Sequence, residues 1–391
     1  MVSTPNRNKE EVNDKPFCVV SYGAGEEPFV NPTVDEPVRT EEIMKRMNLE
    51  FLRPVLDKLY ADAWRFHFDP LAVLKTMIYW RLKGHRFLTD VFNGLLTDPT
   101  LADTLGYGFI PSYQQLYHFI TYRINSKDTK KIFDVLLQKV ICGCERKDIP
   151  IGREIIIDSS PFEKKNDDAT YNTHYGVTGY KWHNVRCVRT DIPLEYHVST
   201  ITDYDGDFFA PLIYRMKMIH DLQPKRVFAD GHYSDGKNLM RMREFFGIET
   251  ICHIDKNAVI KPDADIRELK RQYQKLWESE LFKTNADIDY MKWFLMMHDK
   301  TEVLEDFYHN QMLKKYLKDP ESYEKKYVIR ELIEHCHGRE KRLTEIKNIQ
   351  AKDMEKFTAH IGMHVVSILA LALVRLQNGV TENLTFRGGM I

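Results

Sequence analysis

Two aspartates that each follow a short apolar run are the first residues that could carry chemistry. Asp158 follows residues 155–157 (Ile-Ile-Ile), and Asp230 follows residues 227–229 (Val-Phe-Ala). Such runs predict buried strands, and ligands bind at strand ends in open α/β sheets. Neighbouring carboxylates repel each other unless a cation lies between them, and Mg²⁺ prefers oxygen ligands. The alternative is a turn or helix-cap aspartate, above all for Asp230, which precedes Gly231.

A third acid lies on a predicted helix among other polar side chains with regular spacing. Tyr327, Arg330, Glu334 and Lys341 fall within an arc of roughly 60° when a helix turns by about 100° per residue. One face of the helix would therefore present a phenol, a guanidinium, a carboxylate and an ammonium group. The alternative is an exposed helix face with charge pairs, because further charged residues lie nearby.

This spacing, in the segment YVIRELIEHCHGREK, resembles the Tyr-x2-Arg-x3-Glu-x6-Lys signature of insertion-sequence DDE transposases. The segment IIIDSSPFEKK resembles the first strand of that family with its metal aspartate. RVFADGHYSD resembles the family's strand-Asp-Gly-Tyr turn, although Gly231 and His232 both precede Tyr233 here. Residues 70–119 resemble the helical N-terminal domain. The resemblance covers about residues 40–380 and leaves out the charged segment before the third motif.

The resemblance implies an RNase H-like fold and a DNA-cutting and DNA-joining enzyme. It implies that Asp158, Asp230 and Glu334 are catalytic and hold two Mg²⁺ ions, for which Mn²⁺ can substitute. The reaction is in-line attack at phosphorus, first by water and later by a DNA 3′-hydroxyl, with no covalent protein nucleophile.

The resemblance also implies that the other three residues of the signature contact DNA phosphates, namely Tyr327, Arg330 and Lys341. Lys164 and Lys165 follow the first aspartate and either grip DNA or form a basic surface. The expected partners are double-stranded transposon ends and target DNA, with a homodimer on DNA and no membrane. The expected location is the prokaryotic cytoplasm, in association with the nucleoid.

Two alternatives to an active transposase remain open at this point. The chain could be a catalytically silent relative that binds DNA without cutting it. It could also be an RNase H-like nuclease without strand transfer. The acidic loop at Asp203, Asp205 and Asp207 lacks the spacing of a calcium loop, and we predict a solvated turn.

The composition excludes little. The chain has 391 residues, 43% hydrophobic and 29% charged, with a formal net charge of −1, which is ordinary for a soluble protein. DNA binding would need basic residues gathered on one face. The six cysteines form no disulfide framework. The start of the chain has no signal-peptide pattern, and the most apolar run, 365–374, is too short for a membrane span.

The elements that would position the site begin with helices. We predict a disordered lead-in over 1–39 and an all-α domain over 40–147, with Thr40 capping the first helix and Asp69-Pro70 opening the second. Apolar residues at helical spacing support the later helices of this domain.

The pattern then changes to an α/β sheet. Strands are predicted at 155–157, 180–190, 194–202, 227–229 and 248–254. The second and third form an antiparallel hairpin, and helices at 210–221 and 235–246 separate the last three. This order predicts a mixed sheet with flanking helices.

We assign residues 148–256 to the first part of the catalytic domain, 257–322 to a helical insertion and 323–391 to the C-terminal part. The last part would contain a long helix over 323–349 and a final helix over 354–376.

Overall fold

The computed structural model describes residues 39–60, 68–254, 258–260, 301–343 and 346–385. All of the expected lead-in over 1–39 except Arg39, and most of the expected insertion over 257–322, lie outside these residues. Between 39 and 145, every regular element that the structure describes is helical. These elements are α1 (Thr40–Arg46), η1 (Glu50–Leu52), α2 (Arg53–Leu56), η2 (Asp57–Tyr60), α3 (Pro70–Lys83), α4 (Leu88–Thr97), α5 (Pro99–Leu105), α6 (Tyr113–His118), η3 (Phe119–Arg123) and α7 (Ser126–Glu145).

The local sequence explains the ends of the buried helix α3. The Asp69 side chain accepts a hydrogen bond from the backbone N–H of Leu71, and Pro70 occupies the first helical position, as predicted. Gly84 ends the helix with a φ of 72°, a left-handed conformation that glycine adopts without strain. At α1 the expectation differs, because Arg39 occupies the cap position and Thr40 is already helical.

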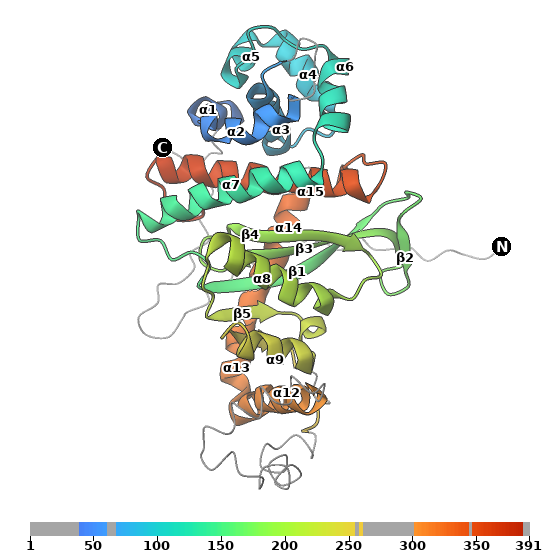
Figure 1. Cartoon of the computed structure of the whole chain (residues 1–391), viewed down its shortest axis with the longest axis vertical. Coiled ribbons are helices and arrows are strands. Elements are labelled where there is room, and N and C mark those ends of the chain that lie inside the picture. Colours follow the sequence, from blue (N-terminus) through green and yellow to red (C-terminus); the bar gives the residue numbers. More distant parts are fainter. Residues whose placement is uncertain (1–38, 61–67, 255–257, 261–300, 344–345, 386–391) are drawn as a thin grey trace, which may run out of the picture.

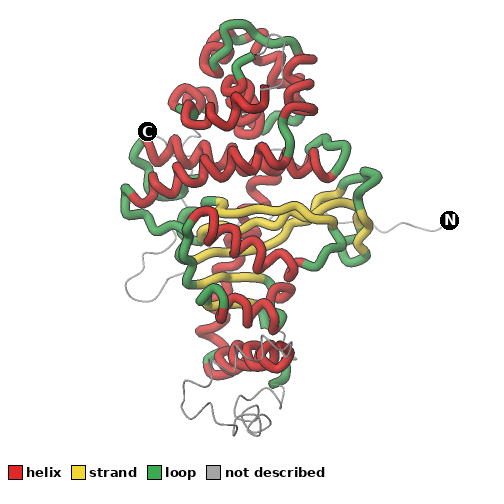
Figure 2. The backbone as a smooth tube through the Cα atoms, viewed as in Figure 1, coloured by secondary structure: helices red, strands yellow, loops and turns green. Residues whose placement is uncertain are grey.

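One mixed sheet forms the centre of the molecule (Figures 1 and 2). Its strand order is β2-β3-β1-β5-β6, and β4 pairs with β3 beside the short β2. The pairs β1–β3, β2–β3 and β3–β4 are antiparallel, whereas β1–β5 and β5–β6 are parallel. The strands are β1 (Glu154–Glu163), β2 (Thr170–Asn172), β3 (Val177–Cys187), β4 (Pro193–Thr200), β5 (Arg226–Ala229) and β6 (Glu249–Cys252).

Helices lie on both faces of this sheet, with α8 and α14 on opposite sides (Figure 1). The prediction of a mixed α/β sheet with an antiparallel hairpin is confirmed, and only the short β2 was not predicted. The helices of this part are α8 (Phe209–His220), α9 (Gly236–Glu244), α12 (Thr301–Lys318), α13 (Pro320–Tyr327), α14 (Glu331–Leu343) and α15 (Met354–Gln377), with short 3₁₀ turns η4 (Asp205–Phe208), η5 (Gly231–Tyr233), η7 (Val328–Arg330) and η8 (Ile346–Asn348).

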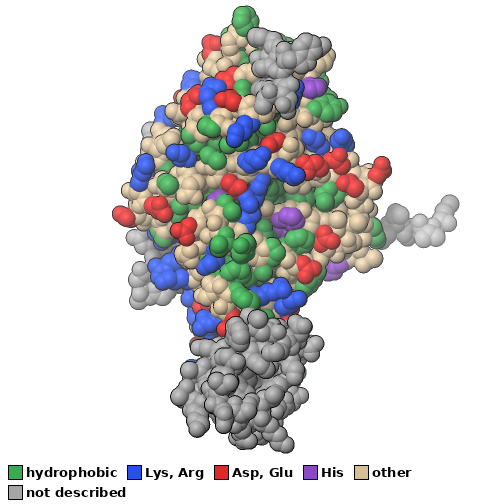
Figure 3. All heavy atoms as spheres, viewed as in Figure 1, with side chains coloured by type: hydrophobic (Ala, Val, Ile, Leu, Met, Phe, Trp, Pro, Cys, Tyr) green, Lys and Arg blue, Asp and Glu red, His purple; other side chains and the backbone are tan. Residues whose placement is uncertain are grey.

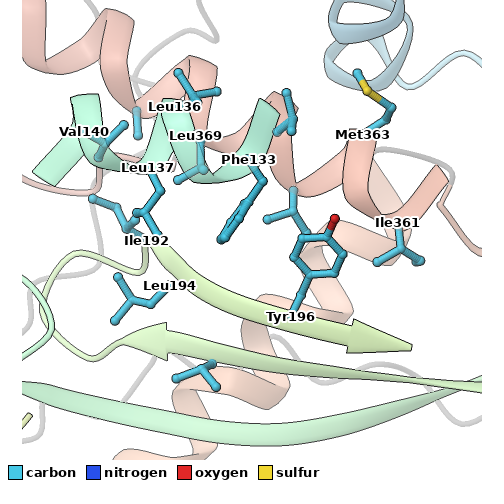
Figure 4. Close-up of a cluster of buried hydrophobic side chains, with 14 of the residues drawn as sticks. Phe133, Leu136, Leu137, Val140, Ile192, Leu194, Tyr196, Ile361, Met363 and Leu369 are labelled. Carbon is cyan, nitrogen blue, oxygen red and sulfur yellow. The ribbon is translucent and has the colours of Figure 1, made fainter. Parts of the chain in front are cut away.

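The core that joins the helices to the sheet lies between α7, α15 and β4 (Figure 4). Each of the three elements contributes fully or nearly buried apolar side chains, so burial of apolar surface holds them together. Representative members are Phe133, Leu137, Leu194, Ile361 and Leu369. The helix α15 is long and apolar enough to cross a membrane, but 89% of its most apolar window is buried inside the protein. It is a core helix of this fold.

Two predictions about the site-bearing elements are wrong. Strand β1 does not end at Asp158 but continues to Glu163, because it pairs with β3 along its whole second half. The helix predicted over 323–349 is not continuous, because η7 interrupts it between α13 and α14. Val328 and Ile329, both of them β-branched, lie in this turn.

Candidate active site

The sheet register brings the two aspartates to the same level. In the parallel pair of β1 and β5, Ile156 is opposite Phe228; Asp158 lies two residues further along β1, and Asp230 lies two residues after Phe228, in extended backbone just past the end of β5. Since side chains alternate along a strand, both residues belong to the same face of the sheet as that pair. Asp158 is 8% exposed. Asp230 is less buried, and its Oδ1 accepts a hydrogen bond of 2.6 Å from the N–H of Gly231.

Arg330 joins the three predicted acids. Its Nη2 lies 3.6 Å from Asp158 Oδ1 and 3.6 Å from Asp230 Oδ2. Its Nη1 donates a hydrogen bond of 2.7 Å to Oε1 of Glu334, one turn further along the chain on α14. The two strands and the helix therefore gather three carboxylates around one guanidinium.

The cluster carries more negative than positive charge, and its pKa values reflect this. Burial raises the pKa of Asp158 to about 7; Arg330 opposes this shift, and Asp230 and Glu334 add to it. Burial alone would lower the pKa of Arg330, but Asp158 and Asp230 outweigh it and raise that pKa above its usual range. Asp158 is thus a carboxylate that would be stabilised by additional positive charge.

The comparison with known families decides what kind of protein carries this arrangement. A family model described as the transposase DDE domain matches residues 150–370, more than half of the chain. The chain belongs to this family. The resemblance inferred from the sequence is thereby confirmed at the level of the family.

No curated protein matches the transposase sequence. Among solved structures, it is similar to a chain of the "Mos1 mariner paired end complex with Mn". The two chains are 12% identical, and the match covers 72% of this chain and 87% of that chain, with a TM-score of 0.19. At this score the likeness carries no argument about fold or function.

Two further residues of the predicted site, Tyr327 and Lys341, make their closest described contacts to other groups than the three carboxylates. Tyr327 is half-buried at the end of α13, with its ring centroid 5.6 Å from that of His253, and burial raises its pKa to about 12. Lys341 reaches strand β1 instead: its Nζ donates to the carbonyl of Pro161 at 3.1 Å and lies 4.6 Å from the Phe162 ring centroid.

The two lysines after β1 differ from each other. The Nζ of Lys164 donates to the backbone carbonyls of Lys347 and Ile349, at 3.2 and 2.9 Å. Lys165 is exposed. The structure thus brings Arg330 to the three carboxylates, and it directs Lys164 to the segment that follows α14.

His337 is a neighbour of the site that the sequence interpretation did not select. It lies on α14 one turn after Glu334, is 5% exposed, and its Nδ1 is 4.0 Å from Oδ2 of Asp158. Its ring centroid is 5.2 Å from that of Trp182, and burial lowers its pKa to about 3, so it is neutral near pH 7. Its spacing of three residues from Glu334 is the helical signal that could have identified it.

Asp205 is a second residue near the site whose environment was predicted incorrectly. It is 7% exposed rather than solvated. Its carboxylate accepts a hydrogen bond of 2.9 Å from Ser159, the residue after Asp158, and forms an ion pair of 2.5 Å with the buried Lys181. The acidic composition of this turn predicts exposure and does not indicate the contacts with Ser159 and Lys181.

A buried ion cluster fixes helix α14 against the sheet. Arg186 of β3 is 2% exposed and pairs with Asp191 at 2.6 Å and with Glu340 of α14 at 2.7 Å. Glu340 also contacts Nε2 of His364 on α15 at 3.1 Å, and Arg339 pairs with Asp191. This cluster joins β3, α14 and α15, and it lies about two turns after Glu334 on the same helix.

The donor atoms of the site fit a hard divalent cation. Three carboxylates from β1, from the turn after β5 and from α14 converge on one positive charge, and oxygen is the ligand atom that Mg²⁺ and Mn²⁺ favour. In the part of the chain that the structure describes, no group of three or more His, Cys, Asp or Glu side chains is placed for simultaneous coordination as it stands. At Asp158 and Asp230, the guanidinium of Arg330 occupies the position between the oxygens.

Proposed function

We propose that this transposase cleaves DNA strands at the ends of an insertion sequence and joins them to target DNA, using Asp158, Asp230 and Glu334. The observation that carries the proposal is the convergence of these three acids, from three separate segments, on the guanidinium of Arg330. Gathering three carboxylates around a single positive charge, with one of them, Asp158, buried, is unfavourable for stability alone. Such an arrangement is typical of functional sites.

We also propose that the catalytic domain is RNase H-like. The supporting observation is the strand order β4-β3-β1-β5-β6, with an antiparallel half and a parallel half that meet at β1. In this proposal, residues 148–256 and 323–391 form the catalytic domain, 257–322 form a helical insertion, and 40–147 form an all-α N-terminal domain.

Asp158, Asp230 and Glu334 would hold two divalent ions, Mg²⁺ or Mn²⁺. When bound, the ions supply Lewis acidity to the attacking and leaving oxygens of an in-line displacement at phosphorus. The side chains of the protein would bind the DNA and shield the site from water. Arg330 would bind a phosphate of the DNA through its planar pair of donors, and the burial of Asp158 keeps bulk water from its carboxylate.

The proposed partner is double-stranded DNA, at both the transposon ends and the target. On the face shown in Figure 3, Lys and Arg side chains are interspersed with Asp and Glu, so contacts to phosphates would be local rather than spread over the surface. Tyr327, Lys341, Lys164 and Lys165 are the further proposed contacts to DNA. Synapsis of two ends would use a homodimer on DNA.

Single substitutions of the three acids test the proposal. Asp158→Ala, Asp230→Ala and Glu334→Ala are each expected to abolish Mg²⁺-dependent cleavage of the cognate ends while DNA binding, measured by gel shift, persists. In this proposal, the cognate ends are terminal inverted repeats that flank the gene. Full cleavage by all three variants would refute the assignment, and absence of cleavage by the unaltered protein would favour a silent DNA-binding relative.

A strand-transfer assay with pre-cut ends separates a transposase from a nuclease. The transposase is expected to join the 3′-hydroxyl ends to a plasmid target, which produces a joined product on a gel. Cleavage of intact ends without any joined product from pre-cut ends would identify a nuclease without strand transfer.

A further inference from the structure

The way in which Arg330 contacts the carboxylates has a consequence for metal binding, which rests on the proposed function. The Nη2 atom lies 3.6 Å from an oxygen of Asp158 and 3.6 Å from an oxygen of Asp230. A divalent ion shared by the same oxygens would lie about 2.0–2.6 Å from each of them. The ion and the guanidinium would therefore repel each other at very short range.

The contacts of Arg330 to the aspartates are also weak for a guanidinium whose side chain is only 16% exposed. At 3.6 Å both are longer than hydrogen bonds. Within the described part of the chain, the Nε of Arg330 is buried without a hydrogen-bond partner. Arg186, in the cluster that fixes α14, instead makes hydrogen bonds of 2.6 and 2.7 Å to carboxylates. The guanidinium of Arg330 therefore loses few hydrogen bonds by leaving the aspartates.

We propose that Arg330 and the divalent cation compete for Asp158 and Asp230, so that metal binding requires the guanidinium to move off these two carboxylates. Arg330 then acts as an internal counter-ion that lowers the metal affinity of the protein without DNA. A phosphate that binds the displaced guanidinium promotes metal binding, and by linkage the metal promotes phosphate binding to the same degree.

Direct metal titration tests the competition without any catalytic readout. Free Mn²⁺ is measured by electron paramagnetic resonance while it is added to the full chain in the absence of DNA. Arg330→Gln is expected to bind Mn²⁺ at least about tenfold more tightly than the unaltered protein, because a charge close to both ligands is removed. Arg330→Ala repeats the test with a smaller side chain.

Lys326 provides a matched control. It is exposed, one turn before Arg330, so Lys326→Gln removes an equal charge close by in the chain. Its Mn²⁺ affinity is expected to stay within about twofold of the unaltered protein, because exposed charges are screened by water. An Arg330→Gln affinity equal to that of the unaltered protein, or an equal gain in Lys326→Gln, would overturn the competition.

A double substitution distinguishes failure of the inference from failure of the proposed function. Asp158→Asn combined with Arg330→Gln is expected to lose the tight Mn²⁺ binding. If the double variant keeps it, or if none of the proteins binds Mn²⁺, the three acids are not the metal site and the proposed function fails with it.

Discussion

Helix α14 takes part in two ion clusters that differ in charge balance. Around Arg330, three carboxylates face one guanidinium. Around Arg186, the carboxylates of Asp191 and Glu340 face two guanidinium groups, those of Arg186 and Arg339. The first cluster is short of positive charge, and the second is balanced.

The pKa values follow this difference. Burial raises the pKa of Asp158 to about 7, and the single Arg330 does not offset it. Burial also acts to raise the pKa of Glu340, but Arg186 and His364 outweigh it and lower it to about 2. Burial is common to both acids, so the local balance of charge decides the sign. The balanced cluster around Arg186 indicates an architectural role, and the shortage of positive charge around Arg330 supports the proposed cation site.

The largest expected effect is on the rate of DNA cleavage, which should depend on the cluster around Arg330. Asp158→Asn is expected to reduce the rate of end cleavage by about 10³-fold or more, which corresponds to roughly 4 kcal/mol of barrier. The metal-free variant is expected to unfold at the same or a higher denaturant concentration than the unaltered protein, since it lacks a buried, undercompensated charge. Cleavage rates and urea unfolding measured on one preparation check both points, and a large loss of stability would contradict the comparison.

A matched pair of glutamates on α14 separates the clusters by stability. Glu340→Gln leaves the buried Arg186 with a missing charge partner and is expected to lower the free energy of unfolding by about 3–5 kcal/mol. Glu334→Gln is expected to change it by less than about 0.5 kcal/mol, because 55% of the Glu334 side chain is exposed. Chemical denaturation measures both, and equal losses would remove the distinction between the two clusters.

The pH dependence of stability gives a smaller effect. A carboxyl with a pKa raised to about 7 binds its proton more tightly in the folded state, so its contribution to stability is present at low pH and is lost as pH rises towards 7. Between pH 5 and pH 7, the metal-free protein is expected to lose about 2 kcal/mol relative to Asp158→Asn.

Unfolding of both proteins in chelator across this range tests the prediction. Comparison with Asp158→Asn cancels the contribution of the buried histidines, whose lowered pKa values act in the opposite direction. Glu340, with a pKa of about 2, contributes stability that is lost only at lower pH. If the difference in free energy of unfolding between the unaltered protein and Asp158→Asn does not change between pH 5 and pH 7, the pKa of Asp158 is not raised.

The sequence located the two strands that carry Asp158 and Asp230, but it did not predict the full extent of the elements around them. Apolar runs before Asp158 and Asp230 were sufficient to find both strands, because burial on both faces leaves a local signature. The extension of β1 to Glu163 was not predicted, since residues 158–163 are stabilised by pairing with β3, a partner distant in sequence. The break at η7 was missed for a related reason, because the helical spacing of polar residues continues across it.

The ion partners were the least predictable part. Arg330 was expected to contact DNA, and its helical spacing indicated a pair with Glu334 but not its contacts to Asp158 and Asp230. The positions of His337 and Asp205 near the site depend on contacts between segments that are far apart in the chain, and the local sequence does not predict such contacts. The role of Arg186 was not visible at all, because a lone arginine in a predicted strand is ordinarily placed at an edge or on an exposed face.

The parallel register of β1 and β5 has a practical consequence for engineering. Hydrogen bonds between the strands, rather than the length of chain that connects them, set Asp158 and Asp230 side by side. A shift by one residue would send one carboxylate to the other face of the sheet. The turn after β2, where Tyr175 is exposed, lies in the connection between them. A peptide tag spliced there would lengthen the chain between the two acids and leave their spacing unchanged.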